Sequence, residues 1–193
     1  TGSGFGVRDS AWVRRHLPDG VTMREATNSL AVINVCGPKA RDVLQTLTPA
    51  DLSNAGFPFL AAKEIEIGLA TALAVRVGYV GELGWELYVP QDYAVHVYEA
   101  LKEAGAPHGI ADVGYRAIES CRLEKGYLYW SADVTPETTP YEAGLGFAVA
   151  LDKGDFIGRE ALAEAKAAGP QRKLVTLTVD GFAPFLGGET VLL

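Results

Sequence analysis

The alternation of apolar and polar residues is most regular in the middle of the chain. Residues 71–79 alternate and are rich in β-branched side chains, and residues 85–89 alternate again. Gly81 and Gly84 lie between these segments and supply backbone freedom. The pattern therefore predicts two strands joined by a glycine-rich bend.

The two faces of the second strand differ in chemistry. Successive side chains of a strand point to opposite faces, so the apolar set from Trp85 to Val89 should pack inward. Glu86 and Tyr88 should then share the other face, with Tyr79 near the carboxylate. An ionised carboxylate can accept two parallel N–H bonds from a flat, amino-bearing heterocycle. Glu86 is thus a candidate ligand-binding residue, and the alternative is an edge hairpin with a solvated glutamate.

Helices and further strands are predicted on both sides of this hairpin. Helices are expected over residues 7–17, 38–47, 91–104, 113–125 and 159–168. An additional strand is expected over residues 29–36, residues 64–68 lead into the central strand pair, and residues 172–180 alternate as the start of a new sheet. This order of elements predicts the α+β fold class, with helices packed on mainly antiparallel sheets.

The composition is that of an ordinary soluble protein and excludes several functions. The chain has 193 residues, of which 48% are hydrophobic and 21% charged, and its formal net charge is -7. Acidic residues are scattered, so neither nucleic acid nor an anionic membrane surface is an expected partner. No apolar run is long enough for a membrane span, and no signal peptide is predicted.

Cysteine and histidine are too sparse for a disulfide framework or a metal site. Cys36 and Cys121 each lie in apolar sequence and are expected to be buried thiols. The three histidines are far apart, so no metal ligand set is expected. A reducing compartment fits best, which means the cytoplasm, or the mitochondrial matrix if the source is eukaryotic.

Two blocks of the sequence resemble a known family. Residues 78–86 resemble the Gly-Tyr-Thr-Gly-Glu-x-Gly-Phe-Glu signature of the folate-binding T protein of the glycine cleavage system, an aminomethyltransferase. Residues 122–133 and 139–145 resemble its Arg-Leu-Glu-Ala-Gly and Thr-Pro-x-Glu-Ala-Gly-Leu motifs. With Trp130 and residues 151–159 added, the second block is closer to the T-protein-like C-terminal half of dimethylglycine and sarcosine dehydrogenases.

The resemblance implies that tetrahydrofolate binds this chain. The 2-amino and N3–H edge of the pterin would match the two oxygens of Glu86, and Tyr79 matches a tyrosine of the same motif. Tyr127 corresponds to a residue near the family's folate pocket, although packing at a helix end would explain it equally well. The implied reaction captures a carbon, carried by an amine donor, as 5,10-methylenetetrahydrofolate. FAD would belong to a missing N-terminal domain, because this chain has no credible dinucleotide-binding fingerprint.

The sequence departs from the family pattern at two places. Aligning on Arg122 puts Ile118 where the family has a folate-proximal arginine, and Arg116 is half a helical turn away. In the family, a catalytic aspartate lies N-terminal to everything in this chain, and Asp9 does not match it. No catalytic residue is therefore predicted.

The domain organisation follows from the same resemblance. Residues 1–154 are expected to be part of the folate-binding domain, 155–170 a connecting segment with a helix, and 171–193 the start of a small β-barrel. Both ends suggest a piece of a longer protein, and the resemblance implies that this protein is a flavin-containing enzyme. A free-standing T protein and a non-catalytic folate-binding regulatory or structural module on the same fold are the alternatives.

Overall fold

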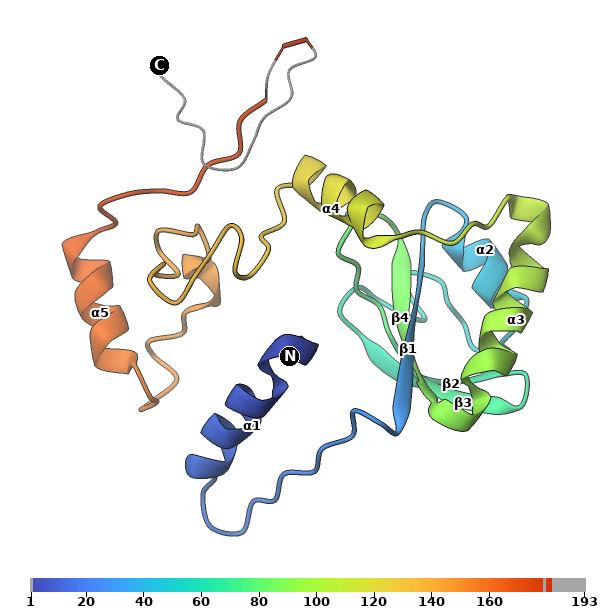
Figure 1. The fold of residues 1–193 in the computed structure, drawn as a ribbon, viewed down its shortest axis with the longest axis horizontal. Coiled ribbons are helices and arrows are strands. Elements are labelled where there is room, and N and C mark those ends of the chain that lie inside the picture. Colours follow the sequence, from blue (N-terminus) through green and yellow to red (C-terminus); the bar gives the residue numbers. More distant parts are fainter. Residues whose placement is uncertain (1, 179, 182–193) are drawn as a thin grey trace. The chain divides into compact units, whose positions relative to one another are not determined.

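The computed structural model describes residues 2–178, 180 and 181, and the chain divides into two units, Thr1–Tyr115 and Arg116–Leu193. Figure 1 shows its helices and strands. The 3-10 helices are η1 (Ser3–Phe5), η2 (Gln91–Tyr93), η3 (Ala106–His108) and η4 (Gly146–Ala148). The α-helices are α1 (Gly6–Arg15), α2 (Ala40–Gln45), α3 (Ala94–Gly105), α4 (Tyr115–Glu124) and α5 (Arg159–Ala168). The strands are β1 (Leu30–Cys36), β2 (Ala62–Ile67), β3 (Ala70–Val75) and β4 (Gly84–Pro90).

The first unit is built on an antiparallel sheet with strand order β1-β4-β3-β2. Helices α2 and α3 cover one face of it, as Figure 1 shows. The predicted α+β class with antiparallel strands is therefore confirmed.

The hydrophobic core lies between these helices and the sheet. Apolar side chains from one face of each strand pack against the apolar stripes of α2 and α3. This packing removes the apolar surface of both the sheet and the helices from water. The largest fully buried side chains are Trp85, Phe57, Leu44, Leu52, Ile67, Leu87, Val89 and Val97. The predicted inward set of β4 is thus confirmed.

The predicted hairpin of β3 and β4 is also confirmed, with Val75 opposite Glu86. Gly81 in the connecting loop has a φ of 71°, which a residue with a Cβ rarely adopts. Gly84 is required for a different reason, since a Cβ there would lie 2.7 Å from the carbonyl oxygen of Val35 in β1.

The first strand of the hairpin ends earlier than predicted. The backbone N–H of Val77 donates to the carbonyl of Val75 at 2.9 Å, which forms a tight three-residue turn. The chain leaves the sheet there, so Tyr79 lies in the loop before β4 and not on a strand. The apolar alternation continues through this turn, which is why the sequence pattern missed it.

The prediction that Cys36 and Cys121 are buried is wrong, and two further apolar segments are more exposed than their sequence suggests. Strand β1 is buried on one face only, with Val32 50% exposed, because α2 and α3 cover a single face of the sheet. Both cysteines are exposed: Cys36 shares the uncovered face with Glu86, and Cys121 lies on α4, where Arg122 is the buried residue. Helix α1 forms as predicted but buries no residue, and its Val7 is 89% exposed.

The second unit contains α4, η4, α5 and long irregular connections. Helix α5 has the predicted bounds. The strand predicted over residues 172–180 is wrong for residues 172–178, which form no strand. There the Leu174 N–H donates to the carbonyl of Glu142, a contact within the unit that replaces sheet pairing. Val179 and residues 182–193 lie outside the described residues, as does most of the expected barrel.

The residues around Glu142 tie that segment to the rest of the unit. The Glu142 carboxylate accepts hydrogen bonds from the Thr139 N–H and hydroxyl and from Arg172 Nε. The backbone N–H of Thr139, followed by Arg172, lowers the pKa of Glu142 below its ordinary value.

None of the helices in the described residues is long and apolar enough to cross a membrane.

Candidate functional site

Glu86 lies in the middle of β4 and is half-buried. Its Oε2 accepts a hydrogen bond of 2.8 Å from the Tyr88 hydroxyl, which follows it on the same face. This bond raises the pKa of Tyr88 above its ordinary value, since the phenol proton is held by the carboxylate. A carboxylate offers about four lone-pair sites, so Glu86 can accept further N–H donors beside Tyr88.

The neighbouring strands surround this pair with three apolar side chains and one asparagine. Val75 of β3 and Asn34 of β1 stand opposite Glu86, while Leu73 and Val32 stand opposite Tyr88. Directly paired residues point to the same face, so all of them line one surface. Val32 is 50% exposed and Leu73 is 42% exposed. The face therefore combines the oriented carboxylate of Glu86 with exposed aliphatic side chains on which a flat ring can lie. Asn34 and the exposed Glu64 share this face.

Trp85 anchors β4 from the other face. Phe57 meets its ring edge-on at 6.1 Å, and the guanidinium groups of Arg41 and Arg76 lie 5.9 and 5.7 Å from the ring centroid. Both arginines donate to Oδ1 of Asn54, at 2.7 and 2.8 Å. These contacts fix Trp85, and with it the backbone that carries Glu86.

The other two predicted site residues lie in different parts of the chain. Tyr79 is in the loop before β4 and is 38% exposed. Tyr127 follows α4 in the second unit and is 40% exposed; its backbone N–H donates to the carbonyl of Arg122 at 2.9 Å. Glu86 is thus hydrogen-bonded to Tyr88, which the sequence had placed on the right face without a role. Their two-residue spacing on a strand was the available signal.

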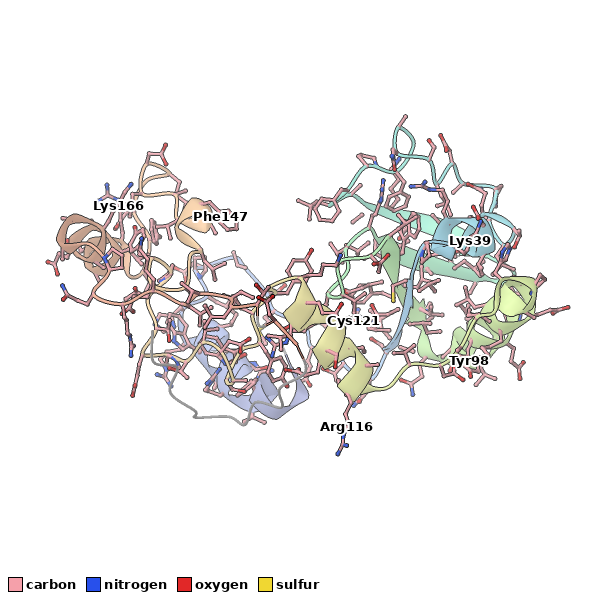
Figure 2. The ribbon with its side chains drawn as sticks, turned by 90° about the horizontal axis from the view of Figure 1, so that it is seen from above. Lys39, Tyr98, Arg116, Cys121, Phe147 and Lys166 are labelled. Atoms are coloured by element: carbon pink, nitrogen blue, oxygen red, sulfur yellow. The ribbon has the colours of Figure 1, made fainter. Side chains whose placement is uncertain are left out.

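The two residues compared with the family's arginine lie on α4. Arg116 is exposed in the first turn of α4, and Figure 2 shows its side chain extending away from the helix. Ile118 occupies the aligned position and is partly buried.

Within the part of the chain that the structure describes, no three His, Cys, Asp or Glu side chains gather where a metal ion could be held.

Comparison with known proteins finds related sequences. Sarcosine dehydrogenase of Mus musculus, a mitochondrial protein, is 42% identical over 170 residues, covering 88% of this chain and 18% of the enzyme. Mitochondrial dimethylglycine dehydrogenase of Homo sapiens is 42% identical over 183 residues, covering 93% of this chain and 21% of the enzyme. The chain therefore spans about a fifth of the length of these dehydrogenases.

The fold is similar to that of a solved aminomethyltransferase. The glycine cleavage system aminomethyltransferase T of Bartonella henselae matches with a TM-score of 0.73 and 28% identity, over 89% of this chain and 46% of that one. The family described as GCVT N-terminal domain matches residues 1–153. With well over half of its residues matched, and with the antiparallel sheet and hairpin in place, the chain belongs to the GCVT N-terminal domain family.

Proposed function

We propose that this chain is the tetrahydrofolate-binding, one-carbon transfer region of an enzyme of the dimethylglycine or sarcosine dehydrogenase type. In this proposal, Glu86 holds the 2-amino and N3–H edge of the pterin, and Tyr79 and Tyr127 supply aromatic contact to the folate. The product is 5,10-methylenetetrahydrofolate.

The observation that carries the proposal is the arrangement around Glu86. Its carboxylate is half-buried and oriented by Tyr88 on a face that exposes aliphatic side chains. Partial burial strengthens a charge-assisted hydrogen bond, and the aliphatic surface favours a flat heterocycle over a small polar ligand. A solvated edge glutamate would need neither feature.

The proposed reaction transfers a methylene group from an amine to the folate. Oxidation of an N-methylglycine produces an iminium whose CH₂ carbon is electrophilic. The two folate nitrogens N5 and N10 form bonds to that carbon, the bond from the carbon to the donor nitrogen breaks, and the two N–H protons leave with the released amine. The residues of this chain bind and orient the folate and limit access of water to the iminium.

The oxidation itself is assigned to another part of the parent enzyme. FAD would be held by a flavin domain outside this chain, and no residue of this chain is proposed to bind it. The two dehydrogenases are mitochondrial, which supports the matrix as the compartment if the source is eukaryotic.

Calorimetric titration of 5-formyltetrahydrofolate into the full-length protein tests the proposal. Glu86→Gln keeps the shape of the side chain but replaces one acceptor oxygen by an NH₂ group, which opposes the pterin amino group. A hydrogen bond to a charged group contributes about 1.5–3 kcal/mol, so the dissociation constant should rise about ten- to a hundredfold.

Glu64→Gln is the matched control. Glu64 is an exposed carboxylate of β2 on the same face of the sheet, because it pairs with Leu73, which in turn pairs with Tyr88. It should leave the affinity unchanged. Absence of folate binding in the wild-type protein, or equal binding by Glu86→Gln, would contradict the proposal.

A further inference from the structure

Arg122 at the end of α4 is charged, yet only 3% exposed. Its Nη1 donates to the Tyr127 carbonyl at 2.9 Å and to the Asp133 carboxylate, and its Nη2 donates to Glu119. The Glu119 and Asp133 carboxylates raise the pKa of Arg122, with Glu119 making the largest contribution. Burying a charge is unfavourable unless it is paired, so the surrounding structure depends on these carboxylates.

Asp133 has a second contact that closes a loop. It accepts a hydrogen bond of 2.8 Å from the Tyr129 N–H, and its own N–H donates to the Tyr129 carbonyl at 2.9 Å. The Ser131 N–H donates to the Val134 carbonyl at 2.8 Å. Residues 129–134 are therefore tied together from both ends.

The loop holds a backbone conformation that it would not adopt alone. Ser131 has a φ of 78°, one of two non-glycine residues with positive φ in the described part of the chain. Such a conformation persists only where the surrounding contacts determine it. The hydrogen bonds to Asp133 and Val134 provide those contacts.

Residues 127–130 present three aromatic side chains at the surface. Tyr127 is 40% exposed, Tyr129 46% and Trp130 43%, and the guanidinium of Arg122 lies 5.7 Å from the centroid of the Tyr129 ring. Arg122 therefore contacts the loop through the backbone of Tyr127, the carboxylate of Asp133 and the ring of Tyr129. A side chain with this set of contacts fixes both ends of the aromatic segment.

We propose that the ion pair of the buried Arg122 with Asp133 is a positioning device that holds the aromatic loop, residues 127–130, in its binding geometry. This inference rests on the proposed function, since Tyr127 is the loop residue assigned to the folate. Neither charged residue touches the ligand. They act through the loop backbone, so both are positioning residues.

Hydrogen–deuterium exchange of the full-length protein tests the positioning without any ligand. Asp133→Asn keeps an acceptor oxygen for the Tyr129 N–H but removes the charge that pairs with Arg122. Exchange in the peptide covering residues 127–134 should accelerate about tenfold, while the hairpin of residues 70–90 keeps its wild-type rate. Glu137→Ala is the control, because Glu137 is an exposed residue on the same connection. This substitution should change the exchange rate of neither peptide.

Folate affinity in a double-mutant cycle tests the consequence. Asp133→Asn should weaken 5-formyltetrahydrofolate binding about tenfold in the wild-type background, but less than about twofold when Tyr127→Ala is also present. A merely structural role would lower the folded fraction and leave the affinity of the folded protein unchanged. Arg122→Lys is the second variant if Asp133→Asn does not fold, because lysine keeps the charge but lacks the fixed fork of donors.

The outcomes separate this inference from the proposed function. Unchanged exchange in residues 127–134, or an equal loss of affinity in both backgrounds, overturns the positioning role alone. If the wild-type protein takes up no folate, the proposed function is wrong and the folate part of this inference falls with it.

Discussion

Tyr88 fixes the orientation of the carboxylate that the proposed function depends on. A glutamate side chain has rotamer freedom that must be lost when a ligand binds it through both oxygens. The hydroxyl of Tyr88 already holds Oε2 at 2.8 Å, so part of this loss occurs on folding. An oriented acceptor binds a flat donor edge better than a freely rotating one.

Tyr88→Phe should therefore weaken folate binding without abolishing it. Because Tyr88 acts on the ligand only by orienting Glu86, its loss should cost less than a direct hydrogen bond to a charged group, about 0.5–1.5 kcal/mol. This corresponds to an increase of about two- to tenfold in the dissociation constant of 5-formyltetrahydrofolate, measured by calorimetry. Because the pKa of Tyr88 is raised from 10.0, the contact is complete below pH 10 and is lost as the pH rises through the raised value. The variant should lack this alkaline loss.

Tyr98→Phe is the control for that experiment. Tyr98 also donates to a carboxylate, Asp112, but it lies on α3, away from the face of Glu86. Folate affinity in Tyr98→Phe should equal that of the wild type. Wild-type affinity in Tyr88→Phe would show that Tyr88 does not orient the ligand carboxylate.

At this scale the sequence predicts which face a residue occupies better than which residue it contacts. The two-residue period correctly predicted that Glu86 and Trp85 lie on different faces of the sheet, because successive side chains of a strand point to opposite faces. The position of Tyr79 depended on the hydrogen bond from Val77 to Val75, which ends the strand. The apolar alternation of the sequence continues beyond Val77, so the pattern could not predict that the strand ends at this hydrogen bond.

At the scale of elements, β4 is held by a pair of arginines that forms no salt bridge in the described residues. The charge of Arg41 acts on Asp51 from a distance, since the pKa of Asp51 is lowered chiefly by the Ser53 backbone N–H and in small part by Arg41. Arg41 of α2 and Arg76 after β3 both donate to the neutral Oδ1 of Asn54, and neither forms an ion pair there. Two cations sharing one neutral acceptor repel each other. Their packing over Trp85 offsets this cost and locks the strand to the helix layer.

Asn54→Asp should therefore stabilise the fold. The substitution keeps the shape of the side chain and places a carboxylate between the two guanidinium groups, which should add about 0.5–1 kcal/mol at pH 7 and raise the thermal midpoint. Two adjacent cations depress the pKa of the new carboxyl, so the gain is present above about pH 4 and is lost as the pH falls through the depressed value.

Asn28→Asp, in an exposed turn before β1, provides the control and should not stabilise the protein. If Asn54→Asp has a lower midpoint than wild type at pH 7, the arginine pair is not short of a negative partner.

Elements were predictable where their apolar period was uninterrupted, and burial was predictable only where the covering layer could be inferred. Strands β1, β3 and β4 follow from such periods, and helix α5 follows from its alanine-rich composition. In α4 the buried residue is Arg122, whose ion pairs with Glu119 and Asp133 depend on a loop that folds back onto the helix. A hydrophobic stripe cannot reveal a buried cation.

At the scale of the whole molecule, the proposed function makes the chain one part of a longer catalytic cycle. The chain spans about a fifth of the dehydrogenases that it resembles, and the proposal assigns the oxidation of the amine to another part of the parent protein. The family motifs made this relationship recognisable from the sequence. The alternation in residues 172–180 wrongly predicted a strand within residues 172–178, because Leu174 pairs with Glu142 in this unit instead of with a neighbouring strand.

A free-standing aminomethyltransferase or a non-catalytic folate module would share the same binding step. All three hypotheses require Glu86 to hold the pterin, and they differ in what supplies the carbon. The central claim is therefore the position of the folate.

A crystal structure of the full-length protein with 5-formyltetrahydrofolate tests that claim most directly. The account predicts the 2-amino and N3 nitrogens of the pterin at about 2.7–3.2 Å from the two carboxylate oxygens of Glu86, with Tyr127 against the folate. A folate bound elsewhere, with Glu86 in contact with Tyr88 alone, would contradict it.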